Sequence, residues 1–546
     1  MPRLANFVVL IVMDGWGSAP PSPGNAITLA NPITLNSLWA SYPHTLLSAS
    51  GESVGIPRGE PGNTEAGHLN LGAGRIVYQD LPRINLAIAE GSFFKNEVFL
   101  EAIAHARTYN SNLHLMGLVG AGGVHSNVEH LYGLLRLARE QQFTRVYLHV
   151  FTDGRDSPPT AALTYIQQLE KVVATEQVGT IATVMGRYWA MDRDFRWERT
   201  ERAYLVLTKG QGKRATSVQE AIESSYKEKK TDEFIEPTLI TDESGNPHSL
   251  IKDNDAIIFF NYRIDRPRQL TKAFVLPDFE ERAQKEWDFD PYMVKYYQKH
   301  NVEIPQRPVF QRGPLLQNLY FVTMTQYGKL LPVHVAFPPE TVELPLGRVL
   351  SERGVRQLRM AESEKERFVT FYFNGQQELP FAGEDRIIIP SPAVATYDLK
   401  PEMAAREITA AFLENLRVNP QSYGFTLINF ANADMVGHTG NLAAGIVACK
   451  TVDSCVGEIV NVVEELGGAV LLTGDHGNAE EMINPITGQP RTEHSDNSVP
   501  FIIISKQFVT QPRTLPAGIL ADVAPTVLYL LGIDKPLVMT GRNLLS

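Results

Sequence analysis

The chain has 546 residues, 43% of them hydrophobic and 20% charged, and its formal net charge is −11 at pH 7. This length exceeds the size at which one hydrophobic core is usual, so we expect two domains or one domain with a large insertion. The acidic balance argues against a nucleic-acid partner, because proteins that bind phosphate backbones usually present a basic face. No apolar run approaches the roughly 20 residues that span a bilayer, which argues against a membrane protein and favours a cytoplasmic one.

The first predicted element is a buried strand at residues 8–13, which ends at Asp14. Residues 61–68 then form a glycine-punctuated loop that opens a helix, with Thr64 near its start. One interpretation makes Asn63 or Thr64 an ordinary helix cap. The other makes Thr64 a nucleophile that is activated by metal coordination, with adjacent backbone amides that cradle a phosphoryl group. Taken by itself, the loop favours the cap.

The middle of the chain predicts a second α/β domain. Residues 80–335 have their own alternation of apolar runs and helix-like stretches. Residues 1–79 and 340–546 would then form one discontinuous domain, with 336–339 as part of the hinge region. Segment 280–317, rich in Lys, Tyr, Gln and Pro, is predicted to be an irregular surface insertion.

Arginines gather beside small or aromatic residues in this middle domain. Because arginine forks bind phosphate and carboxylate bidentately, several that converge on one pocket would suit a phosphorylated carboxylic acid. For any single arginine, a salt bridge to a neighbouring aspartate is the simpler explanation. The candidates are Arg155, Arg187, Arg193, Arg263 and Arg266, together with His125 in a glycine-rich loop.

Two later predicted strands, 425–430 and 469–473, also lead into acidic residues and histidines. In an open parallel sheet the ligand site lies outside the carboxyl ends of the strands, so these side chains and Asp14 would converge there. Each pattern alone has a structural explanation as a capped helix, an ion pair or a surface histidine. Together they would suffice for two adjacent divalent ions, and ligands without thiolate suit Mn²⁺ or Zn²⁺. The candidate ligands are Asp14, Asp434, His438, Asp475, His476 and His494.

Nine segments, in order along the chain, resemble the 2,3-bisphosphoglycerate-independent (cofactor-independent) phosphoglycerate mutases of the alkaline phosphatase superfamily. They are MDGWG (13–17), GNTEAGHLNLGAGR (62–75), GGVHS (122–126), DGRD (153–156), GRYWAMDRD (186–194), NYRIDR (261–266), RMAESEK (359–365), DMVGH (434–438) and GDHGN (474–478). The resemblance implies an α/β fold with an alkaline-phosphatase-like doubly wound sheet formed by both chain ends. An inserted α/β phosphotransferase domain would bind the substrate.

The resemblance also implies two divalent metal ions, with Mn²⁺ expected and Zn²⁺ or Co²⁺ as alternatives. One ion would be held by Asp434, His438 and His494, and the other by Asp14, Thr64, Asp475 and His476. Catalysis would use Thr64, Asp156 and Lys365. Substrate contacts would come from His125, Arg155, Asp156, Arg187, Arg193, Arg263, Arg266 and Lys365.

The activity implied is the interconversion of 3-phosphoglycerate and 2-phosphoglycerate in glycolysis and gluconeogenesis, by a monomer and without bisphosphoglycerate. The intermediate would be a phosphothreonine at Thr64, where the family usually has serine. The main alternative is a metal-dependent phosphomonoester hydrolase of the same superfamily. A second alternative is a catalytically inactive metal-binding relative.

Overall fold

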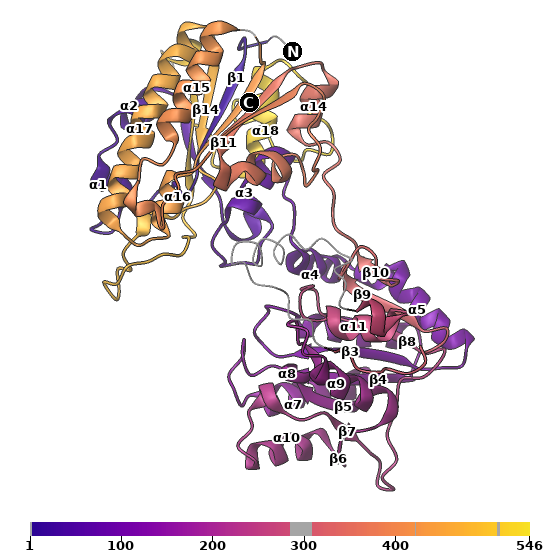
Figure 1. The fold of residues 1–546 in the computed structure, drawn as a ribbon. Coiled ribbons are helices and arrows are strands. Elements are labelled where there is room, and N and C mark those ends of the chain that lie inside the picture. Colours follow the sequence, from indigo (N-terminus) through magenta and orange to yellow (C-terminus); the bar gives the residue numbers. More distant parts are fainter. Residues whose placement is uncertain (1–2, 284–307, 421, 510–513) are drawn as a thin grey trace. The chain divides into compact units, whose positions relative to one another are not determined.

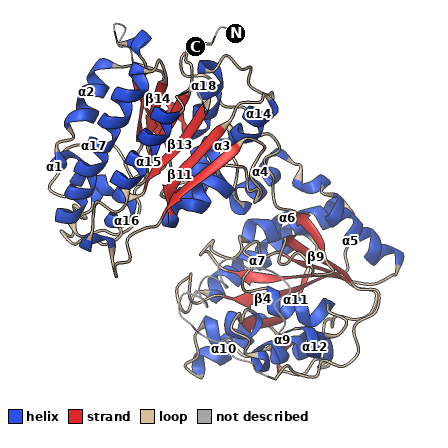
Figure 2. Cartoon of the chain, turned by 45° about the horizontal axis from the view of Figure 1, so that its top comes forward, coloured by secondary structure: helices blue, strands red, loops and turns tan. Residues whose placement is uncertain are grey.

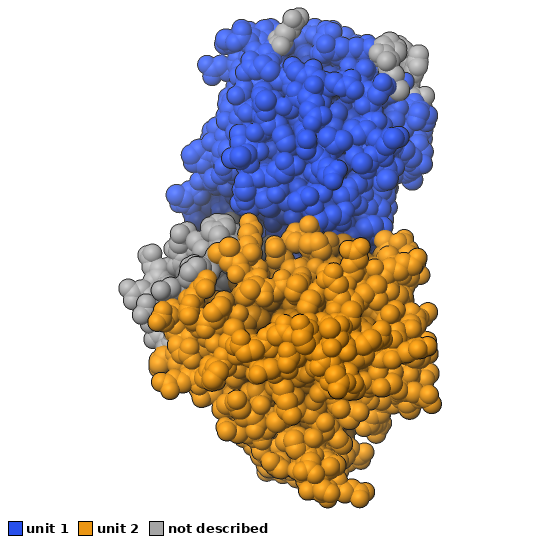
Figure 3. Space-filling model, turned by 90° about the vertical axis from the view of Figure 1, so that its right-hand side faces the viewer, with its two compact units in different colours: residues 1–82, 340–546 blue, residues 83–339 orange. Residues whose placement is uncertain are grey.

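The computed structural model describes residues 3–283, 308–420, 422–509 and 514–546. The chain forms two compact units, Met1–Pro82 with Glu340–Ser546 and Arg83–Pro339, here called unit 1 and unit 2 (Figure 3). The first is built from both chain ends, which confirms the predicted fold class. Within the described residues, no helix is both long and apolar enough to span a bilayer.

Unit 1 contains an eight-stranded sheet of order β12-β11-β13-β1-β14-β15-β2-β16. The strands are β1 (Val8–Met13), β2 (His44–Ser48), β11 (Gln357–Glu362), β12 (Glu384–Ile389), β13 (Phe425–Phe430), β14 (Ala469–Thr473), β15 (Val499–Ile504) and β16 (Gly518–Ile519). β1, from the start of the chain, lies between β13 and β14 from its end and is parallel to both (Figure 1). β15 is antiparallel to its neighbours.

Helices cover both faces of this sheet (Figure 2). Val8, Leu10 and Val12 pack into one core cluster, and Val9 and Ile11 pack into another, because successive strand residues point to opposite faces. A strand buried on both faces must be apolar throughout, which explains the continuous apolar run at 8–13. The first cluster includes residues of α3 (Thr64–Ala73), α14 (Leu346–Glu352) and α18 (Val523–Leu530). The second includes α1 (Ala26–Ala30), α2 (Ile33–Ser41), α15 (Ala405–Val418) and α17 (Leu442–Glu465).

Unit 2 has its own eight-stranded sheet, of order β10-β9-β8-β3-β4-β5-β7-β6, in which the β5–β7 pair is antiparallel. The strands are β3 (Leu113–Val119), β4 (Val146–Thr152), β5 (Thr180–Gly186), β6 (Lys213–Ala215), β7 (Thr238–Ile240), β8 (Ala256–Phe259), β9 (Tyr320–Thr325) and β10 (His334–Phe337). The main helices are α4 (Asp80–Glu90), α5 (Glu97–Thr108), α6 (Val128–Glu140), α7 (Ala162–Glu176), α9 (Trp197–Lys209), α10 (Val218–Lys227) and α11 (Arg268–Val275).

The segments that connect the two units contain a helix and a strand. Helix α4 runs across the limit at residues 82–83, and β10 extends to Phe337, inside the predicted hinge region 336–339. The predicted borders at 79/80 and 335/340 lie within a few residues of the limits of the units. Of the predicted insertion at 280–317, residues 284–307 lie outside the described residues, and its first residues belong to the short helix α12 (Phe279–Arg282).

Candidate functional site

The carboxyl ends of β1, β13 and β14 bring together the acidic residues that follow them. Asp14 directly follows β1, and Asp475 lies two residues after the end of β14. Asp434 lies on the short helix α16 (Asn432–Gly437). Because the three strands are parallel neighbours, their carboxyl ends share one edge of the sheet. Asp14 and Asp475 are 0% exposed and Asp434 is 2% exposed, so the chain buries three carboxylates there.

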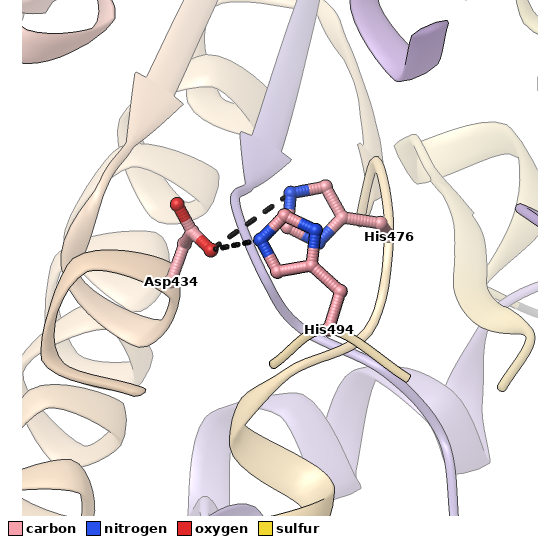
Figure 4. Close-up of side chains that lie close together, drawn as sticks. All are labelled: Asp434, His476 and His494. Atoms are coloured by element: carbon pink, nitrogen blue, oxygen red, sulfur yellow. Dashed lines mark ion pairs between the residues drawn. The ribbon is translucent and has the colours of Figure 1, made fainter. Parts of the chain in front are cut away.

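The first candidate metal group surrounds Asp434 Oδ1. Ligand atoms of Asp434, His476 and His494 lie within 4.8 Å of one another (Figure 4). Nε2 of His494 is 3.1 Å from Asp434 Oδ1, and Nε2 of His438 is 3.2 Å from the same oxygen. The three predicted ligands of this ion therefore lie together, with His476 3.9 Å from Asp434 Oδ1.

Two backbone carbonyls orient the histidines of this group. His438 Nδ1 lies 2.7 Å from the Thr492 carbonyl oxygen, and His494 Nδ1 lies 2.8 Å from that of Gly62. A carbonyl oxygen only accepts, so each neutral ring carries its proton on Nδ1 and directs the Nε2 lone pair at the site. This second-layer contact is the usual way in which proteins prepare histidine for a metal ion.

The second candidate group consists of Asp14, Asp475 and His476, whose ligand atoms also lie within 4.8 Å of one another. Asp475 Oδ1 accepts hydrogen bonds from the backbone N–H groups of Gly15 and His476. Its other oxygen, Oδ2, is buried and has no hydrogen-bond partner among the described residues, although His68 Nδ1 lies 3.3 Å away. A buried carboxylate oxygen without a hydrogen-bonding partner costs free energy unless a cation binds it, so the residues fit a divalent metal ion.

Thr64 begins α3, and its hydroxyl faces this second group. The cap of α3 is Asn63, whose side chain accepts from the Ala66 N–H at 2.8 Å. The hydroxyl of Thr64 is thus not used as a cap and lies 3.3 Å from Asp14 Oδ1 and 2.9 Å from His476 Nε2. The two interpretations of the loop apply to different residues, with Asn63 as the cap and Thr64 as the buried hydroxyl of the site.

Lys365 lies with the carboxylates, close to the nucleophile candidate. Its ammonium group donates to Asp14 at 2.8 Å, to Asp434 at 2.6 Å and to Thr64 Oγ1 at 3.1 Å. Burial alone would lower the pKa of Lys365, but the attraction of the three aspartates raises it well above its usual value. The side chain is therefore a fixed positive charge beside the Thr64 hydroxyl.

The same carboxylates raise the pKa of His476. Burial would lower the pKa of this imidazole, but Asp475, Asp14 and Asp434 raise it to about 10. The pKa of Asp475 moves the other way, because His476, His68 and Lys365 outweigh its burial and lower it to about 2. In the metal-free protein the negative charge of the site is partly offset by a proton on His476.

Unit 2 carries the arginine cluster, which lies after β3, β4, β5 and β8. These strands are neighbours in the sheet and parallel, so the loops at their carboxyl ends converge. Arg187 is 2% exposed and donates to Asp153 at 2.6 Å and to Asp156. Arg193 and Arg263 share Asp265, at 2.6 and 3.2 Å.

The remaining predicted residues of this cluster occupy its centre and its edge. His125 lies between Asp156, at 3.6 Å, and Asp265, at 3.7 Å. Arg266 donates to the Met191 carbonyl oxygen, and burial followed by the nearby Arg187 and Arg193 lowers its pKa to about 10. Arg155 is more peripheral, with its side chain 56% exposed and 3.7 Å from Glu233.

Several residues of both clusters were not predicted. Asp153 supports the arginine cluster, because it accepts from Arg187 and from the backbone N–H of Asp156. Asp265 neutralises two arginines. Both belong to motifs already singled out, DGRD and NYRIDR, and the alternation of charge within those motifs was the available signal. In unit 1 the unpredicted residues include His68, Asn429, Asn478 and Glu480, which contact ligand-bearing segments through buried hydrogen bonds.

Comparison with known proteins identifies the family. Residues 84–329, within unit 2, match the family model described as the BPG-independent PGAM N-terminus. A 2,3-bisphosphoglycerate-independent phosphoglycerate mutase of Chloroflexus aggregans is 52% identical over 542 residues, which cover 98% of each chain. The corresponding protein of Moorella thermoacetica is 49% identical over 538 residues, again with 98% of both chains covered.

A solved structure gives the same result for the fold. The phosphoglycerate mutase of Leishmania mexicana, in a structure determined at low cobalt concentration, is 29% identical with a TM-score of 0.55. The alignment covers 99% of this chain and 98% of that one, so both units are included. With relatives of this identity over nearly its whole length, the chain belongs to the family of 2,3-bisphosphoglycerate-independent phosphoglycerate mutases, which are isomerases.

Proposed function

We propose that this isomerase interconverts 3-phosphoglycerate and 2-phosphoglycerate through a phosphothreonine at Thr64, without bisphosphoglycerate, in glycolysis and gluconeogenesis. The observation that supports this most is the position of the Thr64 hydroxyl, which is buried and lies within 3.3 Å of Asp14, His476 and Lys365. A hydroxyl held by a carboxylate, an imidazole and an ammonium group at the start of a helix is suited to nucleophilic attack on phosphorus.

The proposed metal ligands are those of the two groups above. Asp434, His438 and His494 would hold one ion, and Asp14, Thr64, Asp475 and His476 the other. Divalent ions at these positions supply charge stabilisation to the attacking and leaving oxygens of an in-line phosphoryl transfer. Carboxylate and imidazole ligands fit Mn²⁺, which we propose, and also Zn²⁺ or the cobalt named for the Leishmania mexicana structure.

Side chains of unit 1 would assist the transfer. The Lys365 ammonium group, 3.1 Å from Thr64 Oγ1, offsets negative charge that develops on this oxygen and on the phosphoryl group. The first turn of α3 presents backbone N–H groups and the positive end of the helix dipole to the same region.

Side chains of unit 2 would retain the glycerate while the phosphoryl group is on Thr64. Arginine forks bind the phosphate and carboxylate groups of the substrate, and retention matters because the same glycerate must take the phosphoryl group back. Asp156 would move the proton to and from the glycerate hydroxyls. Burial would raise the pKa of Asp156, but the hydrogen bond and charge of Arg187 lower it, so the carboxylate is ionised at neutral pH, the form that a proton acceptor requires.

The proposal is tested with the full-length protein, supplied with Mn²⁺ and 3-phosphoglycerate but no bisphosphoglycerate. The measurement follows 2-phosphoglycerate and free phosphate in the same reaction. We expect the isomer with little phosphate. Phosphate released in amounts equal to the substrate consumed would instead establish a phosphomonoester hydrolase. The monomeric state, the cytoplasmic location and the lack of nucleic-acid and membrane partners remain predictions from the sequence.

A further inference from the structure

Glu480 is a buried carboxylate that none of the proposed chemical steps uses. It lies in the short 3₁₀ helix η7 (Ala479–Glu481) and is 1% exposed. A buried carboxylate is retained only where hydrogen bonds or charges compensate for its lost hydration. The donors that compensate Glu480 come from three separate loops, and each of these loops carries a proposed metal ligand.

Each oxygen of Glu480 accepts hydrogen bonds from a different set of these loops. Oε2 accepts from the backbone N–H of Gly17 at 3.1 Å and from that of Asn478 at 2.8 Å. Oε1 accepts from the Ser495 hydroxyl and from the Asn497 side chain, the latter at 3.0 Å. Gly17 follows Asp14 by three positions, Asn478 follows His476 by two, and Ser495 is next to His494.

Two glycines allow the carboxylate to approach this closely. A Cβ at position 17 would lie 2.2 Å from the carboxyl carbon of Glu480, and one at position 477 would lie 2.2 Å from Ser495 Oγ and 2.3 Å from Glu480 Oε1. Neither glycine has a left-handed backbone, so the requirement is one of space. The Glu480 side chain thereby explains the second glycine of MDGWG, and Glu480 and Ser495 together explain the second glycine of GDHGN.

We propose that Glu480 is a positioning residue that holds the loops of Asp14, His476 and His494 in register for the metal ions. The proposal rests on the metal-dependent function proposed above. Glu480 acts through the loops, because each of its oxygens already accepts two hydrogen bonds and neither contacts a proposed ligand side chain. Without the carboxylate, the three loops lose their shared hydrogen-bond acceptor, and the metal ligands that they carry are no longer held at fixed distances from one another.

The test compares Glu480→Met with Glu480→Gln in the full-length protein after removal of bound metal. Methionine keeps the length of the side chain but offers no carboxylate. Glutamine keeps one oxygen for the two backbone N–H groups, and its amide can donate to the Ser495 hydroxyl, so it should restore part of the function. Titration calorimetry with MnCl₂ alone gives the metal affinity without any dependence on turnover. We expect Glu480→Met to weaken Mn²⁺ binding by about tenfold or more, as second-layer substitutions do, with Glu480→Gln in between.

Glu384 provides a matched control in the same unit. It is also a buried carboxylate, 8% exposed, and it accepts from Asn374 at 2.7 Å and from Arg386 at 2.8 Å, away from all proposed ligands. Glu384→Met should lower the melting temperature but leave Mn²⁺ affinity unchanged at temperatures well below melting. Equal weakening by Glu384→Met and Glu480→Met would overturn the proposal, because it would show general destabilisation.

A finer variant separates the loops. Ser495→Ala removes one donor to Oε1 and leaves both backbone N–H groups on Oε2, so it should weaken one of the two Mn²⁺ binding steps and spare the other. If the unmodified protein and Glu480→Met each bind two Mn²⁺ ions with equal affinity, the positioning role of Glu480 is overturned and the proposed metal-dependent function is not. Failure of the unmodified protein to bind Mn²⁺ would overturn the proposed metal-dependent function itself.

Discussion

The two clusters differ in how firmly the chain holds them and in the sign of their charge. In unit 1, Asp14, Asp434, Asp475 and Lys365 are at most 3% exposed, and three carboxylates face one ammonium group. In unit 2, the side chains of Arg155, Arg193 and Arg263 are 56%, 42% and 47% exposed. The five arginines of that cluster outnumber the four carboxylates that pair with them, those of Asp153, Asp156, Glu233 and Asp265.

This difference indicates separate roles for the two clusters in the proposed reaction. A buried, negatively charged group with fixed hydrogen bonds suits cations and a rigid nucleophile. In the proposed reaction, the half-exposed side chains of Arg155, Arg193 and Arg263 would keep the freedom to adjust to a glycerate that reorients while it stays bound.

Removal of the Thr64 hydroxyl should have the largest effect, because it removes the proposed acceptor of the phosphoryl group. Thr64→Ala should lower kcat at least about 10³-fold, the scale on which loss of a nucleophile acts. Initial rates with 3-phosphoglycerate and Mn²⁺ give the answer. Thr64→Ser is the control, since it keeps the hydroxyl and loses only a methyl group that stiffens χ1. Full activity of Thr64→Ala would show that another residue is the nucleophile.

In the arginine cluster, Arg187→Lys should act on substrate binding. Arg187 bridges Asp153 and Asp156 through Nη1 from a buried position, and lysine, a compact point charge, cannot offer the planar fork to a substrate phosphate or carboxylate. We expect kcat/KM to fall about tenfold or more, the size of one lost charge-assisted hydrogen bond. Arg196→Lys is a matched control, because Arg196 also bridges two aspartates of unit 2, Asp192 and Asp194, but is not a proposed substrate contact. A loss of equal size in the control would contradict a specific role for Arg187.

Metal binding should release protons in unit 1. His476 has a pKa of about 10 in the metal-free protein, so it is protonated at pH 7, whereas a metal ligand must be neutral. The hydrogen bond to Asp434 raises the pKa of His438 as well, which adds to the release. Mn²⁺ affinity should therefore increase as the pH is raised from about 6 to about 9, across and above the ordinary histidine range. Calorimetry in buffers of different ionisation enthalpy counts the protons, and zero protons released at pH 7 would contradict the proposed role of His476.

The smallest expected effect concerns acid stability in unit 2. His130 is 0% exposed, and its burial lowers its pKa to about 3. In the unfolded chain, His130 takes up a proton near the ordinary histidine pKa of about 6.5, whereas in the folded chain it does so only near 3. The contribution of neutral His130 to the free energy of unfolding is therefore complete above about pH 6.5 and is lost as the pH falls toward about 3. One such group changes the free energy of unfolding by at most about 1.4 kcal/mol per pH unit.

The variant for this prediction is His130→Gln, whose amide can still donate to Asn85 Oδ1, the partner of His130 Nε2. The variant should lose less stability than the unmodified protein between pH 7 and pH 5, as measured by urea unfolding of the metal-free chain. Identical pH dependence in the two proteins would show that His130 does not resist protonation. The remaining slope would come from other groups, among them the buried His149, whose pKa is lowered by burial and by the neighbouring His114.

The strands that carry the ligands, the class of fold and the family could all be predicted from the amino-acid sequence. Continuous apolar runs such as 8–13 and 469–473 identify strands buried on both faces, and the residues that follow them are read directly from the chain. Asp14, Asp434 and Asp475 could be assigned to one sheet edge on this basis, because parallel strands end on the same side.

The partners of these residues could be identified only from the three-dimensional arrangement of the chain. Lys365 lies 351 positions from Asp14 along the chain, and Glu480 lies 463 positions from Gly17, so no local pattern connects them. The same holds for the pairing of Arg193 with Asp265 and for the Asp475 oxygen that has no hydrogen-bond partner among the described residues. Such contacts depend on the order of the strands and on the paths of the loops. Both are set by the packing of the whole unit. Periodicity and motif spacing describe only neighbours along the chain.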